Sequence, residues 1–296
     1  MTSIGHVVAA TDFSAFAEQA VRRAARIASQ HRAELHLLHV VRPLDLYPGL
    51  TLAPDEFSHH DQDLQEAEQT RLDAMAGALA GQFDVHIRCA TRLGRAHDEI
   101  AAYARDVSAD LVAVGARGEN TLMDLLLGST ASRLLRVAAC PVLLVRKPAD
   151  AAYRKIVAAV DFSPVSAAVL RQALRLADGA QVEALHVLGS EVEQRLRRAK
   201  LDQVDITNWL DRVRTEAGKK LQALLAAVDP DAAVGRLVET GVPPAAICQH
   251  VEAAQADLVV LGRHGHGGGL QDWLLGSVSK DVAQAAPCDV LLVTSG

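Results

Sequence analysis

Aromatic side chains are scarce in this chain of 296 residues, at 3% of the total. This scarcity argues against a platform on which nucleic-acid bases stack. Basic residues are not in excess either, because the formal net charge is −6, which argues against binding to the phosphate backbone of DNA or RNA. A core with so few aromatics must be built from Ala, Val and Leu. That composition suits parallel sheets covered by helices on both faces.

The sequence has four cysteines, and none of them forms a CxxC pair or has zinc-finger spacing. We interpret Cys89, Cys140, Cys248 and Cys288 as small buried side chains in a reducing compartment. No basic segment with a long apolar run follows Met1, so no signal peptide is expected. No uncharged apolar stretch reaches the ~20 residues that a membrane span needs. We therefore expect a soluble cytoplasmic protein that binds neither membranes nor nucleic acids.

Familiar catalytic and metal-binding motifs are also missing from the sequence. There is no GxSxG elbow, no HExxH and no kinase signature. The segment 58–63 contains His and Asp residues, but we interpret it as solvated rather than as a metal site. His36 and His39 are three apart on an expected strand, so they point to opposite faces and cannot share an ion. We predict no catalytic residues and no metal ligands.

What the sequence does contain is an internal repeat. Four blocks recur in the same order at an offset of about 148 residues. The matching blocks are 6–14 and 155–163, 109–115 and 256–262, 128–129 and 276–277, and 142–145 and 290–293. The join lies in a short polar stretch at 147–152 that contains a proline. The repeat predicts two domains, 1–148 and 152–296.

Each repeat alternates apolar runs with segments of helical periodicity. In the first half we expect strands at 5–11, 34–41, 83–89, 110–115 and 141–146, helices at 15–30, 63–80, 95–107 and 129–138, and a loop at 43–61. The second half follows the same plan, with a longer polar helical stretch around 190–227. The alternation predicts a mainly parallel α/β sheet with right-handed crossovers, whose ligands bind at the carboxyl ends of the strands.

The strongest chemical signal is a glycine pattern in the first half, Gly115-x2-Gly118-x9-Gly128-Ser129. Glycines let the backbone approach a polyphosphate closely. The N–H groups and the positive dipole end of the following helix attract anions, and the hydroxyls of Ser129 and Thr130 add donors. The alternative interpretation is a C-cap glycine followed by an N-capping serine, with no ligand.

Asp12 ends the first expected strand, at the same carboxyl edge as the glycine pattern. Its carboxylate can accept hydrogen bonds from a base amine or a ribose hydroxyl. The alternative role is a helix N-cap, and the two roles are compatible.

The second half departs from this pattern, because ten residues rather than nine separate Gly265 from Gly276. The extra residue falls within 266–269, where glycines are frequent. Either these glycines absorb the insertion as a bulge, or the insertion misplaces the N–H groups that would face a phosphate. Both alternatives stay open at the level of the sequence.

Taken together, these motifs resemble the universal stress protein family. The segments that carry the resemblance are 10–14, 38–41, the glycine pattern and 139–145. The resemblance covers nearly the whole chain, twice over. It implies two tandem doubly wound α/β domains, each with a five-stranded parallel sheet of order 3-2-1-4-5. It also implies that the two domains pack as an intramolecular pseudo-dimer, with pairing of two chains into a homodimer as a further option.

The resemblance further implies binding of ATP, with Mg²⁺ as an optional accompanying ion. In the first half, Thr11, Asp12 and Val41 would surround adenine and ribose, and Gly115, Arg117, Gly118, Gly128, Ser129 and Thr130 would hold ribose and phosphates. Arg117 has an equally plausible role as a solvated loop arginine. The matching positions of the second half are Asp161, Gly262, His264, Gly265, Gly276, Ser277 and Val278.

We therefore expect a stress-linked sensor or regulator that binds an adenine nucleotide, with protein partners that the sequence does not identify. One alternative is an ATP hydrolase or phosphotransferase. It would be slow, because the sequence offers no convincing base, no metal-binding carboxylate pair in the loop and no Walker lysine. The other alternative is an interaction scaffold that binds no nucleotide.

Overall fold

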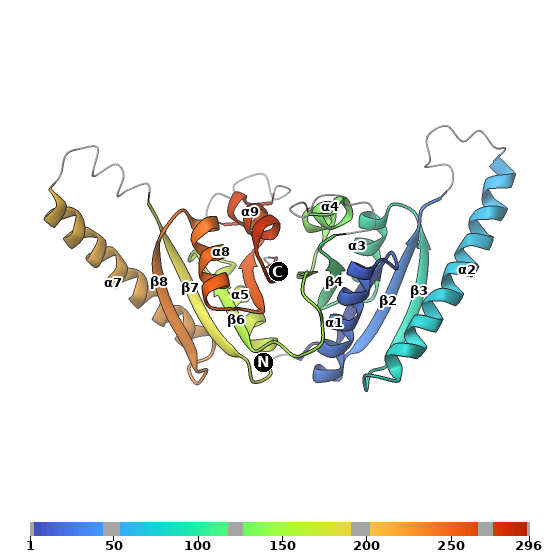
Figure 1. The fold of residues 1–296 in the computed structure, drawn as a ribbon, viewed down its shortest axis with the longest axis horizontal. Helices are drawn as coiled ribbons and strands as arrows, with labels where there is room; N and C mark the ends of the chain where they lie inside the picture. Colours follow the sequence, from blue (N-terminus) through green and yellow to red (C-terminus); the bar gives the residue numbers. More distant parts are fainter. Residues whose placement is uncertain (1–2, 44–53, 118–126, 191–201, 266–274, 295–296) are drawn as a thin grey trace. The chain divides into compact units, whose positions relative to one another are not determined.

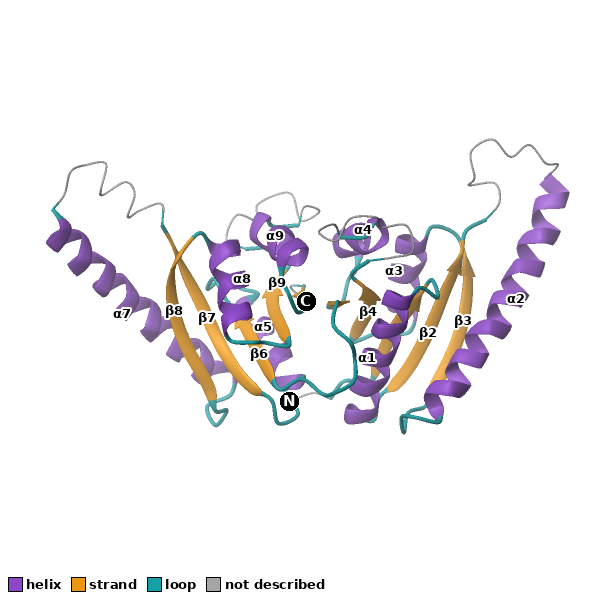
Figure 2. Ribbon diagram, viewed as in Figure 1, coloured by secondary structure: helices purple, strands orange, loops and turns teal. Residues whose placement is uncertain are grey.

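The computed structural model describes residues 3–43, 54–117, 127–190, 202–265 and 275–294. The chain divides into two compact units, Thr2–Ala152 and Tyr153–Ser295. Each unit alternates strands and helices (Figures 1 and 2). Within the described residues, no helix combines the length and the apolar character that crossing a membrane requires.

The first unit contains one parallel sheet with helices packed against it. Its strands are β1 His6–Thr11, β2 Glu34–Val41, β3 Ile87–Leu93, β4 Leu111–Gly115 and β5 Val142–Val145. Its helices are α1 Ala15–His31, α2 Pro54–Ala80, α3 Ala96–Asp106 and α4 Ser129–Val137. Neighbouring strands are parallel and lie in the order β3-β2-β1-β4-β5. This order confirms the predicted 3-2-1-4-5 sheet.

The second unit repeats the same topology. Its strands are β6 Lys155–Ala159, β7 Gln181–Gly189, β8 Val234–Gly241, β9 Leu258–Gly262 and β10 Asp289–Val293. Its helices are α5 Ser166–Arg175, α7 Gln203–Val228, α8 Pro243–Ala253 and α9 Ser277–Ala285. The parallel order β8-β7-β6-β9-β10 is again 3-2-1-4-5 when the strands are counted within the unit.

The central strands are apolar and buried along nearly their whole length. In β1, Val7, Val8 and Ala9 are all 0% exposed, which requires cover on both faces of the sheet. Helix α1 packs on β1 and β4, α2 packs on β2 and β3, and α3 packs on β2 and α4. Fully buried alanines of α1, such as Ala20 and Ala24, face the strands. Small side chains therefore replace aromatics in the core, as the composition predicts.

Two expected boundaries were wrong. Helix α2 begins at Pro54, within the loop expected at 43–61. Proline suits this first position, because it lacks an N–H that the first turn would leave unpaired anyway. Strand β3 covers Ile87–Leu93 rather than 83–89, and pairs from Leu35 with Ile87 onward. The first part of the polar helical stretch expected around 190–227 lies outside the described residues. Its described part, α7, begins at Gln203, after the capping carboxylate of Asp202.

Candidate functional site

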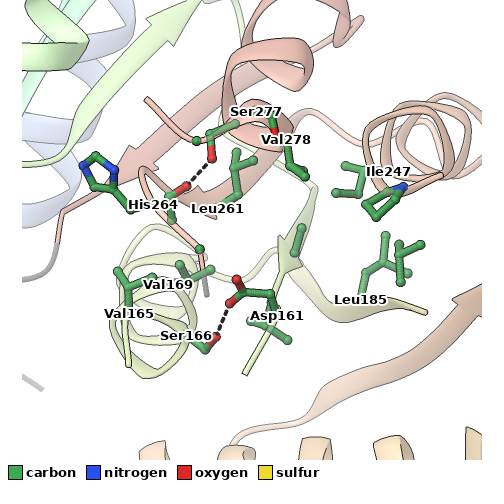
Figure 3. A pocket seen from close by; sticks show the side chains of 18 of the residues that line it. Asp161, Val165, Ser166, Val169, Leu185, Ile247, Leu261, His264, Ser277 and Val278 are labelled. Atoms are coloured by element: carbon green, nitrogen blue, oxygen red, sulfur yellow. Dashed lines mark hydrogen bonds between the residues drawn. The ribbon is translucent and has the colours of Figure 1, made fainter. Parts of the chain in front are cut away.

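A cavity of about 480 Å³ lies at the carboxyl ends of β6, β7 and β9 in the second unit (Figure 3). This edge of the sheet is where a parallel α/β fold places its ligands. The seven residues predicted for the second half all line this cavity: Asp161, Gly262, His264, Gly265, Gly276, Ser277 and Val278.

The carboxylate of Asp161 is held by a tight turn after β6. Its Oδ1 accepts hydrogen bonds from the backbone N–H of Ser163 at 3.0 Å and from the hydroxyl of Ser166 at 3.1 Å. Phe162, between Asp161 and Ser163, has a left-handed backbone conformation with φ of 64°. A non-glycine residue adopts this conformation only at a cost in conformational energy. The turn fixes the carboxylate at the cavity, beside Ser166 (Figure 3).

The start of α9 forms the second wall of the cavity. The N–H of Gly276 donates to the carbonyl oxygen of Arg263 at 3.0 Å, and the hydroxyl of Ser279 donates to the carbonyl oxygen of Gly262 at 2.6 Å. These two bonds pin the first turn of the helix to the end of β9. Gly276 is the N-cap and supplies no side-chain cap, and the first turn carries no acidic residue. The positive end of the helix dipole therefore faces the cavity, and no carboxylate in the first turn neutralises it.

Two glycines of this loop sit where a side chain would collide with a neighbour. A Cβ at Gly265 would lie 2.7 Å from Oδ2 of Asp161, and a Cβ at Gly262 would lie 2.5 Å from Cγ1 of Val165. Both distances are shorter than real Cβ contacts allow. Glycine at these positions brings the loop backbone up to the Asp161 turn and keeps the cavity open.

The remaining lining is apolar. It includes Leu185 and Val187 of β7, Ile247 of α8 and Leu261 of β9. Leu185 and Ile247 lie on one side of the cavity and His264 on the other (Figure 3). Nε2 of His264 accepts a hydrogen bond from Nε of Arg263 at 3.0 Å. The cavity thus combines an apolar wall with a helix start and a carboxylate, an arrangement suited to a ligand with a flat apolar part and an anionic part.

The first unit builds the same edge from equivalent residues. Oδ1 of Asp12 accepts from the N–H of Ser14 at 3.0 Å, and Oγ1 of the buried Thr11 accepts from the N–H of Phe13 at 2.9 Å. Phe13 is left-handed, with φ of 61°. Nδ1 of His39 contacts the carbonyl oxygen of Thr11 at 2.7 Å.

Equivalent contacts recur in the second unit, where Nδ1 of His186 lies 2.8 Å from the carbonyl oxygen of Val160. The rings also pair in the same way. Their centroids are 4.7 Å apart for Phe13 and His39, and 4.2 Å apart for Phe162 and His186. The repeat seen in the sequence therefore extends to the hydrogen bonds of this edge.

The glycine pattern of the first unit is described only in part. A Cβ at Gly115 would lie 2.9 Å from the carbonyl oxygen of Arg117, and the Arg117 guanidinium carbon lies 5.6 Å from the ring centroid of Phe16. The N–H of Gly128 donates to the carbonyl oxygen of Ala116 at 2.9 Å. Gly128 is the N-cap of α4 and has no acidic residue in the turn that follows.

Ser129 is exposed and Thr130 is half-buried at the start of α4. Gly118, also predicted for this site, lies outside the described residues. Val41 is 7% exposed at the end of β2. When the two units are aligned strand by strand, Val41 is equivalent to Leu188, which is not among the residues that line the cavity of the second unit. The preceding residue, Val40, is equivalent to Val187, which does line it. The role of Val41 stays a prediction.

Sequence reasoning missed the apolar wall and the hydroxyls that hold the polar groups. Leu185 and Val187 are two apart on a strand, and that spacing puts both on one face. This signal was available, because the strand was expected. Ile247 and Ser279 come from helices far from Asp161 in the sequence, and only the folded chain brings them to the same cavity.

Comparison with known proteins agrees with this architecture. The model of the universal stress protein family matches residues 3–146 and 152–294. A universal stress protein of Mycolicibacterium smegmatis is 31% identical over 306 residues, covering 97% of this chain and 96% of the relative. One of Mycobacterium bovis is 27% identical over 312 residues, covering 98% of this chain and 95% of the relative.

Among solved structures, a universal stress protein from Archaeoglobus fulgidus superposes with a TM-score of 0.67 at 19% identity, covering 98% of both chains. At that identity the match concerns the fold alone. The two family matches and the full-length relative show that the chain belongs to the universal stress protein family.

Proposed function

We propose that this protein is a stress-linked regulator that binds an adenine nucleotide, ATP foremost, at the carboxyl edge of its sheets. The observation that carries the proposal is the cavity of the second unit, which joins an apolar wall to a glycine-rich helix start and a fixed carboxylate. The membership of the family and the repeated turn at Asp12 extend the proposal to the first unit. We place the protein in the cytoplasm under this proposal.

The described residues fit the parts of ATP. The triphosphate would lie against the start of α9, where the first turn leaves the backbone N–H groups of Ser277 and Val278 and the hydroxyl of Ser277 to face it. The glycines at 262 and 265 leave room that a Cβ would fill. Asp161 would accept hydrogen bonds from ribose hydroxyls, and the apolar wall at Leu185 would contact the base. Mg²⁺, where present, would accompany the phosphates.

A regulatory role fits the described lining better than rapid hydrolysis. Asp161 and His264 are the titratable side chains in the described lining. Asp161 accepts two hydrogen bonds that anchor the turn, an arrangement suited to holding a ligand. A turnover assay with ATP and Mg²⁺ should give rates well below ~1 s⁻¹, the lower end of the usual enzyme range. A faster rate would move the protein into the class of ATP hydrolases.

Calorimetric titration with ATP tests the binding proposal. Wild-type protein should bind ATP, and Gly265→Val should lose the site of the second unit, because the valine would enter the space beside Oδ2 of Asp161. Gly218→Val is the matched control, since a Cβ at Gly218 in α7 meets nothing within 4 Å. Gly128→Val tests the site of the first unit in the same way.

The control should bind like wild type, and each site variant should lower the number of ATP molecules bound per chain. No binding at millimolar ATP would refute the proposal. Unchanged binding in Gly265→Val would also refute it for the second unit.

A further inference from the structure

A second cluster of polar side chains lies at the opposite, amino-terminal edge of the first unit's sheet. His6 is the first residue of β1, and Glu34 is the first residue of β2. The parallel register places His6 beside Glu34 and Val8 beside His36. Glu34 and His36 are two apart on one strand, so they share a face. Residues that are 30 positions apart in the sequence thereby meet on the same face of the sheet.

The ligand atoms of these three residues form a small triangle. Nδ1 of His6 lies 3.3 Å from Nε2 of His36, and Nε2 of His36 lies 3.2 Å from Oε2 of Glu34. The third side, from Nδ1 of His6 to Oε2 of Glu34, measures 3.7 Å. Zinc binds imidazole nitrogen and carboxylate oxygen at about 2.0–2.2 Å, so two of its tetrahedral ligands stand about 3.3–3.5 Å apart. The observed sides, from 3.2 to 3.7 Å, lie around this range.

We propose that His6, Glu34 and His36 bind one divalent transition-metal ion, with Zn²⁺ as the best match to the ligand set. Two imidazoles and one carboxylate are a zinc ligand set, with water in the remaining position. This site is separate from the nucleotide edge and does not depend on the proposed function. No motif in the sequence indicates it, because its ligands come from two strands.

The groups around the triangle orient its ligands. Nδ1 of His36 lies 3.1 Å from the hydroxyl of Tyr103 on α3, which fixes the ring so that Nε2 faces the triangle. Oε1 of Glu34 accepts from Nε of Arg88 at 2.7 Å and contacts Nδ1 of His86 at 2.8 Å. The other carboxylate oxygen, Oε2, is the one that faces the two imidazoles. Side chains that hydrogen-bond to the far atom of a metal ligand, and so orient it, are typical of metal sites.

The cluster is buried at one end and open at the other. The side chain of His36 is 3% exposed, that of Glu34 is 18% exposed, and that of His6 is 43% exposed. An ion and its water ligand can therefore enter from the side of His6. The exposure of His6 also makes it the ligand that can be substituted with least disturbance of the core.

The second unit provides an internal comparison. At the equivalent positions, Lys155 stands in place of His6, and Glu183 and His250 stand in place of His36 and Tyr103. Nζ of Lys155 lies 3.6 Å from Oε2 of Glu183, and Nε2 of His250 lies 3.0 Å from the same oxygen. Gln181 stands at the position of Glu34, so the second unit has a lysine, a glutamine and a glutamate where the first unit has its three ligands. We therefore expect one high-affinity ion per chain.

Titration of the full-length protein with Co²⁺, after removal of metals with a chelator, tests this site. Co²⁺ replaces Zn²⁺ in such ligand sets and gives visible absorption bands that report its coordination. The expected result is one Co²⁺ per chain, displaced by Zn²⁺. His6→Lys, which installs the residue of the second unit, should weaken binding by at least about 100-fold. His250→Gln is the matched control in the second unit and should bind like wild type.

Circular dichroism and thermal melting establish that each variant is folded, and His6→Ala replaces His6→Lys if the lysine variant does not fold. ATP binding should be the same in wild type and in the His6 variants, which separates this test from that of the nucleotide site. Absence of a stoichiometric ion in wild type would overturn the proposal. Binding that survives in the His6 variants would overturn it too, because the ion would then sit on other side chains.

Discussion

Gly115 shows how closely the backbone segments approach each other at the carboxyl edge of the first unit. A Cβ at this position would lie 2.9 Å from the carbonyl oxygen of Arg117 and 3.1 Å from backbone atoms of Phe16. Backbone atoms cannot turn aside as a flexible side chain can. Gly115→Ala should therefore lower the free energy of unfolding by about 1–3 kcal/mol, the usual cost of overpacking. Urea denaturation measures this change, and a loss smaller than ~0.5 kcal/mol would contradict the predicted collision.

The cysteines differ from ordinary thiols because they are partly or fully buried. Burial, reinforced by the neighbouring Asp73, raises the pKa of Cys89 to about 12, and burial raises the pKa of Cys140 to about 11, from an ordinary value of 9.0. Because only the thiolate reacts, the reactive fraction at pH 8 falls on the order of 100- to 1000-fold in the native protein.

Both cysteines should therefore react slowly with a disulfide reagent at pH 8, faster as the pH rises, and at ordinary rates in denaturant. Mass spectrometry of the labelled peptides over time measures each residue. Equal rates for native and denatured protein at pH 8 would show that these thiols are not shielded.

At the scale of the element, the long helices α2 and α7 each contain a glycine that no contact requires. A Cβ at Gly77 or Gly218 would meet nothing within 4 Å. Alanine restricts the unfolded chain and favours the helix, so Gly77→Ala and Gly218→Ala should each raise the free energy of unfolding by about 0.5–1 kcal/mol. Thermal melting measures both variants. A lower melting temperature in either one would mean that its glycine serves a contact or a bend.

The same scale shows what could be predicted from the sequence. Strands such as β1 and β4 are continuous buried apolar runs, and their positions were predicted to within a residue. Strand β3 is half-exposed and contains Arg88 and Arg92, so its pattern is weak and its expected position was wrong. The predicted start of helix α2 came too late in the sequence, because Pro54 was interpreted as part of a loop rather than as the first residue of a helix.

The candidate site likewise contains residues that could be predicted from the sequence and residues that could not. Glycines and an aspartate at strand ends are local signals, so Asp161 and Gly265 could be named from the sequence. The wall at Ile247 depends on how α8 folds back over the strands, and no local pattern contains that information. The cluster of His6 and His36 was missed because histidines were compared only within one strand, whereas these two meet through the parallel pairing of β1 with β2.

At the scale of the whole molecule, the two repeats have diverged at equivalent positions. Phe16 and Thr130 of the first unit correspond to Val165 and Val278 of the second, so the two edges differ in size and polarity. We therefore expect two ATP sites of unequal affinity.

Asp12→Asn and Asp161→Asn should each weaken one of the two binding steps by about 1–3 kcal/mol, because asparagine keeps one acceptor oxygen and loses the charge. Calorimetric titration of both variants and wild type measures the steps. If either substitution left both steps unchanged, that aspartate would not contact the nucleotide.

A crystal structure of the full-length protein grown with ATP and Mg²⁺ tests nucleotide binding at the carboxyl edge most directly. We predict a triphosphate against the start of α9 at Gly276 and Ser277, and an adenine ring against Leu185 and Ile247. An empty cavity at millimolar ATP, or a nucleotide bound away from the carboxyl edge of both sheets, would contradict this prediction.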